Sequence, residues 1–254
     1  MNIIYLLVRE IKYFTNFQNK MYQFLLFFQP LIFLTIVYFL QQLRGDVNTD
    51  RFVVASALIS MWSYVLYSSG SSLVSQRWND TLKLIIAAPM SLFQVIISKA
   101  FSNSIIALIT MVLSFIYAKF IFGFSIHIEN YYLFYLSVLV LIFSLCVVGL
   151  ILAIVFASFQ NVFDYQNLIH TPIILICGVF IPVDQLPAVI EYIAYGIPMT
   201  WGIKAVYEAI DLNTMMYTSM IVSIFVSFIY LFLAVFIIRK MEMVLRQHGK
   251  WGAM

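Results

Sequence analysis

Residues 131–157 read YYLFYLSVLVLIFSLCVVGLILAIVFA, a continuous apolar run without Asp, Glu, Lys or Arg. An α-helix needs about 20 such residues to cross the hydrocarbon core of a bilayer. A membrane β-strand would instead alternate polar and apolar residues over about 10 positions, and this run does not alternate. The stretch is therefore predicted to be a transmembrane helix, long enough to tilt or to protrude from the membrane.

Five other apolar segments are also almost free of charged residues, the exception being Lys99 near the start of the third. The six predicted spans cover residues 24–43, 52–74, 95–118, 131–157, 167–181 and 215–238. The chain is 63% hydrophobic and 10% charged, with a mean hydropathy of +0.99, whereas soluble domains carry about 25% charged residues. We predict an all-α integral membrane protein whose single transmembrane domain covers residues 1–254.

The basic residues between the spans predict how the chain is oriented. With the N-terminus placed inside, ten lie in inner segments: Arg9, Lys12, Lys20, Arg77, Lys83, Lys99, Arg239, Lys240, Arg246 and Lys250. Four lie in outer segments: Arg44, Arg51, Lys119 and Lys204. The positive-inside rule therefore predicts a multi-pass plasma-membrane protein with both termini in the cytoplasm. Its richness in Ile, Phe, Tyr, Asn and Lys suggests a bacterial source with an AT-rich genome.

Residues 1–23 are predicted to form an amphipathic helix in the membrane interface. Ile4, Leu7 and Ile11 recur at helical spacing, with polar residues mostly on the other side. A cleaved signal peptide is not indicated, because charges interrupt the region and no small-residue cleavage site precedes the first span. Within that span, Pro30 removes a backbone donor and predicts a kink.

The sequence carries no recognisable catalytic or metal-binding pattern. It has no phosphate-cradling G-x-x-x-x-G-K-[ST] loop and no paired-carboxylate or Ser/His/Asp arrangement. Cys146 and Cys177 lie within apolar runs, as packing residues do. No carboxylate lies near the centre of a span, although ion-coupled carriers usually have one there. A net charge of +3 is too small to indicate nucleic-acid binding. We therefore expect no enzyme activity, no metal and no bound cofactor, so any energy for transport must come from another polypeptide.

Polar residues follow one side of the second predicted span and of the fifth. These candidate path residues are Ser60, Tyr64, Tyr67, Ser68 and Ser71 in the second span and Asn167, His170 and Thr171 in the fifth. Small hydroxylated residues also let membrane helices pack closely. Two interpretations stay open: a polar lining for a solute path, or helix–helix packing.

The segment at residues 76–89 is predicted to be an amphipathic helix on the cytoplasmic side. Trp78, Leu82 and Pro89 share its apolar face, whereas Arg77 and Asp80 belong to the polar remainder. One interpretation is an interfacial helix that joins two spans. The other is a helix that docks onto a partner protein.

This segment resembles the loop that follows the second span in membrane subunits of ABC-2-type ABC transporters, E-R-E-x-G-T-L-E-x-L-L-x-x-P. The matching residues are Arg77, Thr81, Leu82, Leu84 and Pro89. The residues that depart from the pattern are Gln76, Trp78, Asp80 and Lys83, and the lysine reverses a charge. A second resemblance, to the family's G-x-F-x-P…LP…NP-x-T stretch, involves Gly178, Phe180, Pro182, Pro187 and Pro198. Gly196-Ile197 stands where the family usually has an Asn before the last proline.

The resemblance implies a permease that works within a larger assembly. Two permease subunits, identical or related, would pair in the lipid bilayer above two cassette ATPase subunits, which bind ATP and magnesium. Residues 76–89 would be the coupling helix, with Arg77, Trp78, Asp80, Thr81, Leu82, Lys83 and Pro89 as its ATPase-coupling residues. Residues 183–211 would form re-entrant helices on the outer side, and the resemblance favours export.

The substrate is not readable from the sequence. Forty-four aromatic residues and an uncharged path would suit an amphipathic drug, a hydrophobic or antimicrobial peptide, or a lipid-linked molecule. We favour a drug or peptide, with a polysaccharide or teichoic-acid-type glycan as the alternative. A non-transporting membrane immunity or scaffold protein is the competing function.

Overall fold

All regular secondary structure in the described part of the chain is helical. The computed structural model describes residues 20–44, 49–78, 91–124, 126–157 and 162–248. The longer helices are α3 (Gln29–Arg44), α4 (Thr49–Trp78), α6 (Leu92–Phe120), α7 (Tyr131–Ala157), α8 (Val162–Ile176), α10 (Pro198–Ile210) and α11 (Met216–His248). The shorter ones are α2 (Lys20–Gln23), the π-helical turn η1 (Phe24–Phe28), the 3₁₀ turn η2 (Val183–Gln185) and α9 (Ala188–Tyr195).

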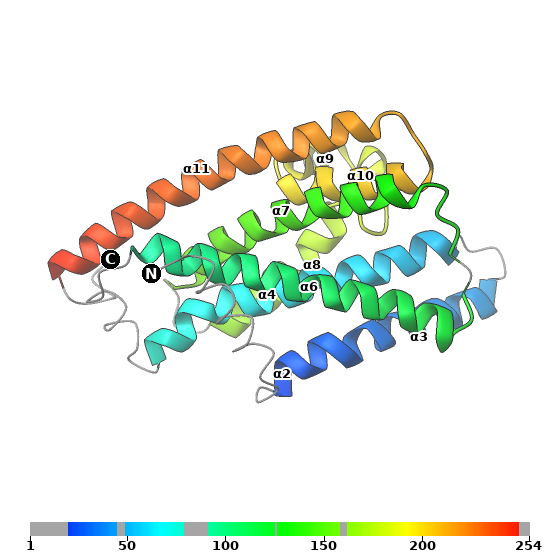
Figure 1. Cartoon of the computed structure of the whole chain (residues 1–254), viewed down its shortest axis with the longest axis horizontal. Coiled ribbons are helices and arrows are strands. Elements are labelled where there is room, and N and C mark those ends of the chain that lie inside the picture. The colour runs from blue at the N-terminus through cyan, green and yellow to red at the C-terminus, as the bar shows by residue number, and fades with distance from the viewer. Residues whose placement is uncertain (1–19, 45–48, 79–90, 125, 158–161, 249–254) are drawn as a thin grey trace.

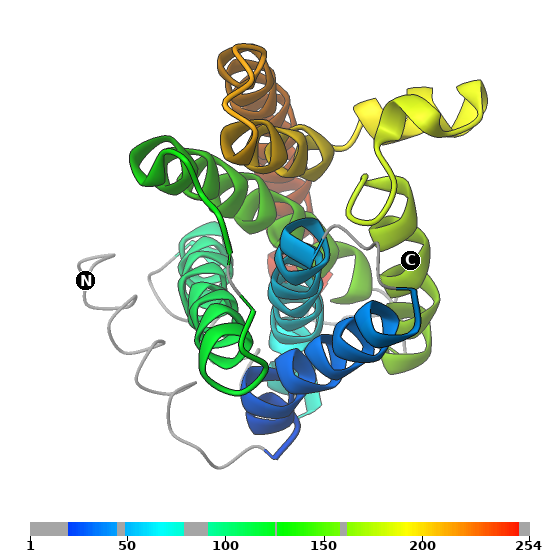
Figure 2. The same ribbon diagram turned by 90° about the vertical axis from the view of Figure 1, so that its right-hand side faces the viewer.

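Helix α4 lies at the centre of the bundle. It packs against α3, α6, α7 and α8, and Figure 2 shows these helices around it. Within the most apolar 18 residues of its stretch Thr49–Ser69, 89% are buried. Ser56, Ser60 and Ser63 are fully enclosed, and each hydroxyl donates to a backbone carbonyl three or four residues earlier in the same helix. Small side chains whose hydroxyls are satisfied internally let neighbouring helices approach closely.

Gly149 of α7 marks the closest approach to α4. A Cβ atom added to this glycine would lie 3.0 Å from both Val65 Cγ1 and Ser69 Oγ. The absence of a side chain at position 149 is therefore what brings the α7 backbone against the α4 side chains.

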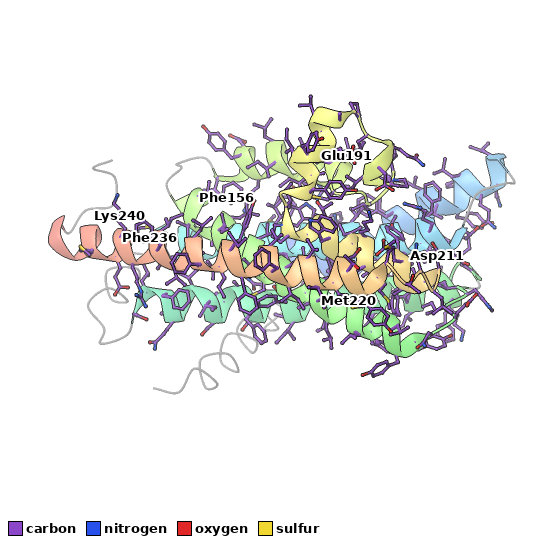
Figure 3. All side chains as sticks on the ribbon, turned by 90° about the horizontal axis from the view of Figure 1, so that it is seen from above. Phe156, Glu191, Asp211, Met220, Phe236 and Lys240 are labelled. Carbon is purple, nitrogen blue, oxygen red and sulfur yellow. The ribbon has the colours of Figure 1, made fainter. Side chains whose placement is uncertain are left out.

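Helix α11 lies at the edge of the bundle, against α7 and α10 (Figure 1). Within its most apolar 18 residues only 22% are buried. Its exposed side chains are large and apolar, among them Ile221, Phe225, Phe232 and Phe236. On its protein side, Ser219 donates to Glu208 of α10 at 2.6 Å and Ser223 donates to the Pro198 carbonyl at 3.2 Å. Figure 3 places Met220 near one end of this helix and Lys240 near the other.

The first predicted span contains a helical irregularity shortly before Pro30. A π-helical turn, η1, directly precedes Gln29, whose backbone N–H donates to the Phe24 carbonyl five residues earlier. Such wider turns occur as short insertions within α-helices. The kink itself stays a prediction, as does the interfacial helix at residues 1–23, of which residues 1–19 lie outside the described residues.

Five stretches in the described residues are long and apolar enough to cross a membrane. They are Lys20–Leu43, Thr49–Ser69, Leu92–Phe120, Tyr131–Phe156 and Met216–Met243, and they match five of the six predicted spans. Two helices continue past the predicted span ends, α4 from position 74 to Trp78 and α11 from position 238 to His248. An apolar run defines where a helix meets lipid, but hydrogen bonding continues the helix into the polar flanks.

The fifth predicted span, 167–181, differs most from the structure. Helix α8 begins at Val162, five residues before the predicted start of the span, and ends at Ile176. Asp164 lies in its first turn, where a carboxylate favours a helix start. Its 15 residues span roughly 22 Å at about 1.5 Å per residue, less than the hydrocarbon core of about 30 Å. A sixth complete crossing by this helix alone is therefore not supported.

Helices α8, α9 and α10 together nevertheless bring the chain from the end of α7 to the start of α11, along the length of the bundle. Helix α8 starts near the end of α7, and α10 finishes near the start of α11 (Figure 1). The chain turns after α8 at Gly178, whose φ of +84° suits glycine. A Cβ atom there would lie 2.8 Å from Val183 Cγ2, so the turn also requires the missing side chain.

Candidate functional site

A polar cluster joins the buried helix α4 to its neighbours α3 and α8. Gln29 of α3 donates from Nε2 to Ser63 Oγ at 2.7 Å, and Ser63 Oγ lies 2.6 Å from Nε2 of His170 on α8. One turn further along α4, Tyr67 donates its hydroxyl proton to Asn167 Oδ1 at 2.5 Å. The Tyr67 and His170 rings lie 5.8 Å apart. These five residues therefore form one connected polar cluster, which we call the α3–α4–α8 cluster.

The hydrogen bonds of Ser63 define the protonation of its neighbours. Its hydroxyl donates to the Ile59 carbonyl at 2.8 Å, and a serine has one proton to donate. Ser63 Oγ is therefore the acceptor for both Gln29 and His170. The imidazole then carries its proton on Nε2 and presents Nδ1 as an acceptor.

Two glutamines at the α3–α4–α8 interface carry buried acceptor atoms. Gln166 of α8 donates from Nε2 to the Leu66 carbonyl at 3.2 Å. Within the described residues, the Oε1 atoms of Gln29 and Gln166 have no hydrogen-bond partner. A buried unsatisfied acceptor costs about 1–3 kcal/mol, so each amide oxygen favours a donor from water or from a solute.

Three of the candidate path residues, Tyr67, Asn167 and His170, come together in this cluster. Ser60 and Ser68 are buried, and each hydroxyl bonds back to α4 itself. Tyr64 is buried with its ring 6.0 Å from that of Tyr22. Their burial is compatible with helix–helix packing, and a role for these three residues in a path stays a prediction. Thr171 is exposed on α8, and the Ser71 side chain lies outside the described residues.

Gln29 and Gln166 were missed by the sequence analysis. Gln29 directly precedes Pro30, to which the sequence analysis assigned only a kink, and Gln166 lies just before the predicted span 167–181. The available signal was helical spacing, because Gln166 lies four residues before His170 and would share its face if α8 began earlier.

The predicted coupling segment lies largely outside the described residues. Gln76, Arg77 and Trp78 continue the α4 backbone, whereas Asp80, Thr81, Leu82, Lys83 and Pro89 fall in residues 79–90, which are not described. Just beyond this segment, Ser91 caps α6, accepting at Oγ from the Gln94 N–H at 3.3 Å.

Helix α11 contacts the chain directly after the coupling segment. Glu242 Oε2 accepts a hydrogen bond from the Leu92 backbone N–H at 3.1 Å. A carboxylate at a helix N-terminus is stabilised by the unpaired N–H groups and by the helix dipole. Ala234 and Ile238 of α11 pack with Ile96 of α6 in a buried cluster that also includes α7. The first turn of α6 is therefore fixed to the last helix.

The prolines of the second motif lie at or directly before the starts of η2, α9 and α10, and Gly178 lies in the turn after α8. Pro182 and Pro187 directly precede η2 and α9, and Pro198 is the first residue of α10. A proline at or before the first helical position loses no helical hydrogen bond. Phe180 is exposed on the turn after α8. The segment 183–211 thus forms two helices, α9 and α10, joined at Gly196-Ile197.

A water-exposed cluster holds η2, α9 and α10 together. Tyr195 donates to Asp184 at 2.9 Å, and Lys204 forms an ion pair with the same carboxylate at 3.4 Å. Trp201 stacks on Tyr195 with ring centroids 4.7 Å apart. The hydrogen bond from Tyr195, together with the Lys204 charge, lowers the pKa of Asp184.

In the part of the chain that the structure describes, no three His, Cys, Asp or Glu side chains are grouped to hold a metal ion. A family model described as ABC-2 type transporter matches residues 1–210. No curated protein matches the chain.

Proposed function

The chain belongs to the ABC-2 type transporter family, and from this premise we propose that it is the membrane-spanning subunit of an ATP-driven exporter. It is a multi-pass membrane protein by its apolar helices and its family. The proposed assembly contains two permease subunits and two cassette ATPase subunits. ATP and magnesium bind to the ATPases, and this chain supplies the path.

The observation that carries the proposal is the α3–α4–α8 cluster. The most deeply buried span carries hydroxyl groups toward a short helix that presents His170 and Asn167. Buried acceptors on Gln29 and Gln166 add hydrogen-bonding capacity at the same interface. Polar groups at membrane depth are costly and tend to be functional. We propose that a substrate passes along α4 and α8, with Tyr67 and His170 in contact with it.

The proposed coupling residues lie at the C-terminal end of α4, beyond the α3–α4–α8 cluster. Residues 76–89 would seat in the ATPase groove, so that a displacement there would move the C-terminal end of α4 and the N-terminal end of α6. The hydrogen bond between Glu242 and the Leu92 N–H supports a second route for the same displacement, because it links the beginning of α6 to α11. The helices α9 and α10 would be the re-entrant helices on the outer side, with both termini in the cytoplasm of a bacterial cell.

An amphipathic drug or peptide is the proposed substrate class. Neutral polar groups together with the tyrosine rings of the α4 region suit such a molecule better than a charged one. A glycan exporter is the alternative, and it would predict stimulation of ATP hydrolysis by lipid-linked glycans instead. An immunity or scaffold protein would not associate with a cassette ATPase.

The deciding experiment places a charge in the coupling segment. Leu82→Asp should abolish ATP-driven transport and association with the ATPase, because it puts a carboxylate on the proposed docking face, while membrane insertion stays intact. Ser91→Asp is the matched control: it adds the same charge nine positions later, where aspartate is a good helix cap.

The two variants are compared by copurification of the ATPase and by transport into inverted vesicles. Full transport by Leu82→Asp would refute the docking role of residues 76–89. Failure of the unmodified chain to copurify with any cassette ATPase would refute the permease proposal itself.

A further inference from the structure

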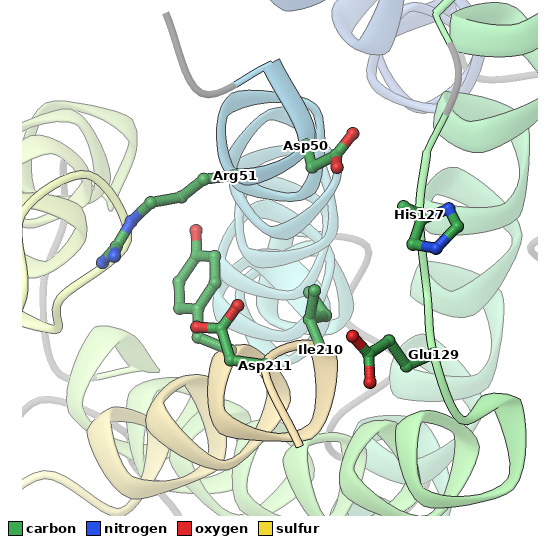
Figure 4. A pocket seen from close by; sticks show the side chains of 7 residues that line it. Asp50, Arg51, His127, Glu129, Ile210 and Asp211 are labelled. Carbon is green, nitrogen blue, oxygen red and sulfur yellow. The ribbon is translucent and has the colours of Figure 1, made fainter. Parts of the chain in front are cut away.

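A second polar site lies at the end of the bundle opposite Glu242. A cavity of about 340 Å³ is lined by Asp50, Arg51, His127, Glu129, Tyr207, Ile210 and Asp211. These residues come from three places: the first turn of α4, the connection between α6 and α7, and the end of α10. Figure 4 shows them arranged around one opening. None of them belongs to the α3–α4–α8 cluster or to the coupling segment.

The charges of this cavity are unbalanced. Its lining contains three carboxylates, on Asp50, Glu129 and Asp211, and one guanidinium. Arg51 extends away from Asp50 (Figure 4), and its Cζ lies 4.6 Å from the centroid of the Tyr207 ring. Among the described residues, none of the three carboxylates forms an ion pair. The cavity therefore carries a negative charge of about two, which favours a cationic occupant.

The Arg51 guanidinium covers the face of the Tyr207 ring in the wall of the cavity. A planar organic cation already lies on the aromatic ring, an arrangement that is favourable by about 0.5–2 kcal/mol. The Tyr207 hydroxyl is held by a 2.7 Å hydrogen bond to the Val179 carbonyl, which fixes the ring in the wall. Ile210 adds an apolar surface beside it.

The volume of the cavity and the positions of its carboxylates favour an organic cation over a metal ion as the ligand. A calcium ion requires oxygen ligands that converge to about 2.3–2.6 Å, and the described carboxylates and His127 do not form such a group. The cavity volume of about 340 Å³ instead lies in the range of small-molecule sites, roughly 300–1,000 Å³. Carboxylates on opposite walls suit two ammonium groups joined by an aliphatic chain.

We propose that this cavity, between the start of α4 and the end of α10, binds an organic dication such as an aliphatic diamine. One ammonium group would lie between Asp50 and His127 and the other near Asp211, with the aliphatic chain against Ile210. The proposal does not depend on the transport function, because it concerns binding to the chain itself.

The test is calorimetric titration of the full-length chain, in lipid nanodiscs at low ionic strength, with 1,4-diaminobutane. We expect saturable binding, no binding of the uncharged isostere 1,4-butanediol, and weaker binding as sodium chloride is added. Glu129→Gln combined with Asp211→Asn should weaken diamine binding at least tenfold. Both residues are exposed, so the fold should tolerate the change.

The matched control combines Asp164→Asn with Glu191→Gln. It changes the net charge by the same amount, but neither residue lines the cavity, so diamine affinity should be unchanged. Equal loss in both double variants, or no saturable binding, would overturn the proposal. Calcium that binds more tightly than the diamine and is lost with the same two carboxylates would instead identify a metal site. If the cavity variant does not fold, Asp50→Asn and the salt titration of the unmodified chain decide.

Discussion

Helices α4 and α11 both cross the bundle, yet their surroundings are opposite. Within the most apolar 18 residues of α4, 89% are buried, against 22% in those of α11. The more buried helix is the less hydrophobic of the two. In water the order would be reversed, since burial there favours apolar residues. Here lipid takes the exposed apolar side chains, and the protein interior takes the hydroxyls.

The serines of the two helices show the same difference at single positions. On α4, Ser56, Ser60 and Ser63 lie inside the bundle. On α11, Ser219 and Ser223 recur every four residues and mark the one side that faces protein. In a membrane helix, small polar residues therefore indicate the protein side, as phenylalanines indicate the lipid side.

The largest effect on the free energy of unfolding is expected when one large aromatic residue in each helix is replaced by alanine. Trp62 of α4 is 1% exposed and Phe232 of α11 is 74% exposed. Trp62→Ala should lower the free energy of unfolding by about 3–5 kcal/mol through the cavity it leaves, and Phe232→Ala by less than about 1 kcal/mol. Unfolding in mixed micelles by titration with SDS measures both. A cost at Phe232 as large as that at Trp62 would mean that protein, and not lipid, covers this face of α11.

A smaller effect is expected from removing one hydroxyl in each helix. Ser63→Ala should cost about 1–3 kcal/mol, because Gln29 and His170 both lose their acceptor. Ser227 is also fully buried, but its hydroxyl has no partner among the described residues, so Ser227→Ala should be neutral or stabilising. The same micelle titration compares the two variants. Equal costs would contradict the assignment of Ser63 as the shared acceptor.

The smallest effect concerns the elements η2, α9 and α10, of which α10 packs against α11. Because folding lowers the pKa of Asp184, the folded state binds fewer protons there. Its stabilising effect is complete above the unfolded pKa of about 3.9 and disappears as the pH falls through the lower folded value. Tyr195→Phe removes the main cause of the shift and should reduce this acid sensitivity. Tyr192→Phe, the same change at an exposed position of α9, should leave the pH profile unchanged, and an equal response would refute the assignment.

The sequence predicts the spans well because hydrocarbon imposes a length and excludes charge. The apolar run at residues 131–157 coincides with α7, and the other long spans agree within a few residues. Helix α8 was misplaced because its first turn contains Asp164 and Gln166, which a hydropathy argument assigns to a loop. Hydropathy reports contact with lipid, whereas helix ends depend on local hydrogen bonding.

The candidate site was only partly predictable for a related reason. Helical spacing placed Tyr67 and His170 on polar faces, but it could not tell a lining residue from a packing residue. Ser60 and Ser68 share the α4 face and use their hydroxyls within their own helix. The role of Gln29 depends on how α3 lies against α4, and no periodicity within one helix contains that information.

Helix α11 is attached at both ends, which has a mechanical consequence. Ser219 bonds to Glu208 of α10, and Glu242, 23 residues later, bonds to the start of α6. At about 1.5 Å per residue, the two attachments are roughly 35 Å apart along a continuous helix. A rod fixed at both ends transmits axial displacement without bending. A shift at the start of α6 can thus reach α10 along the edge of the molecule, without any rearrangement of the densely packed α4.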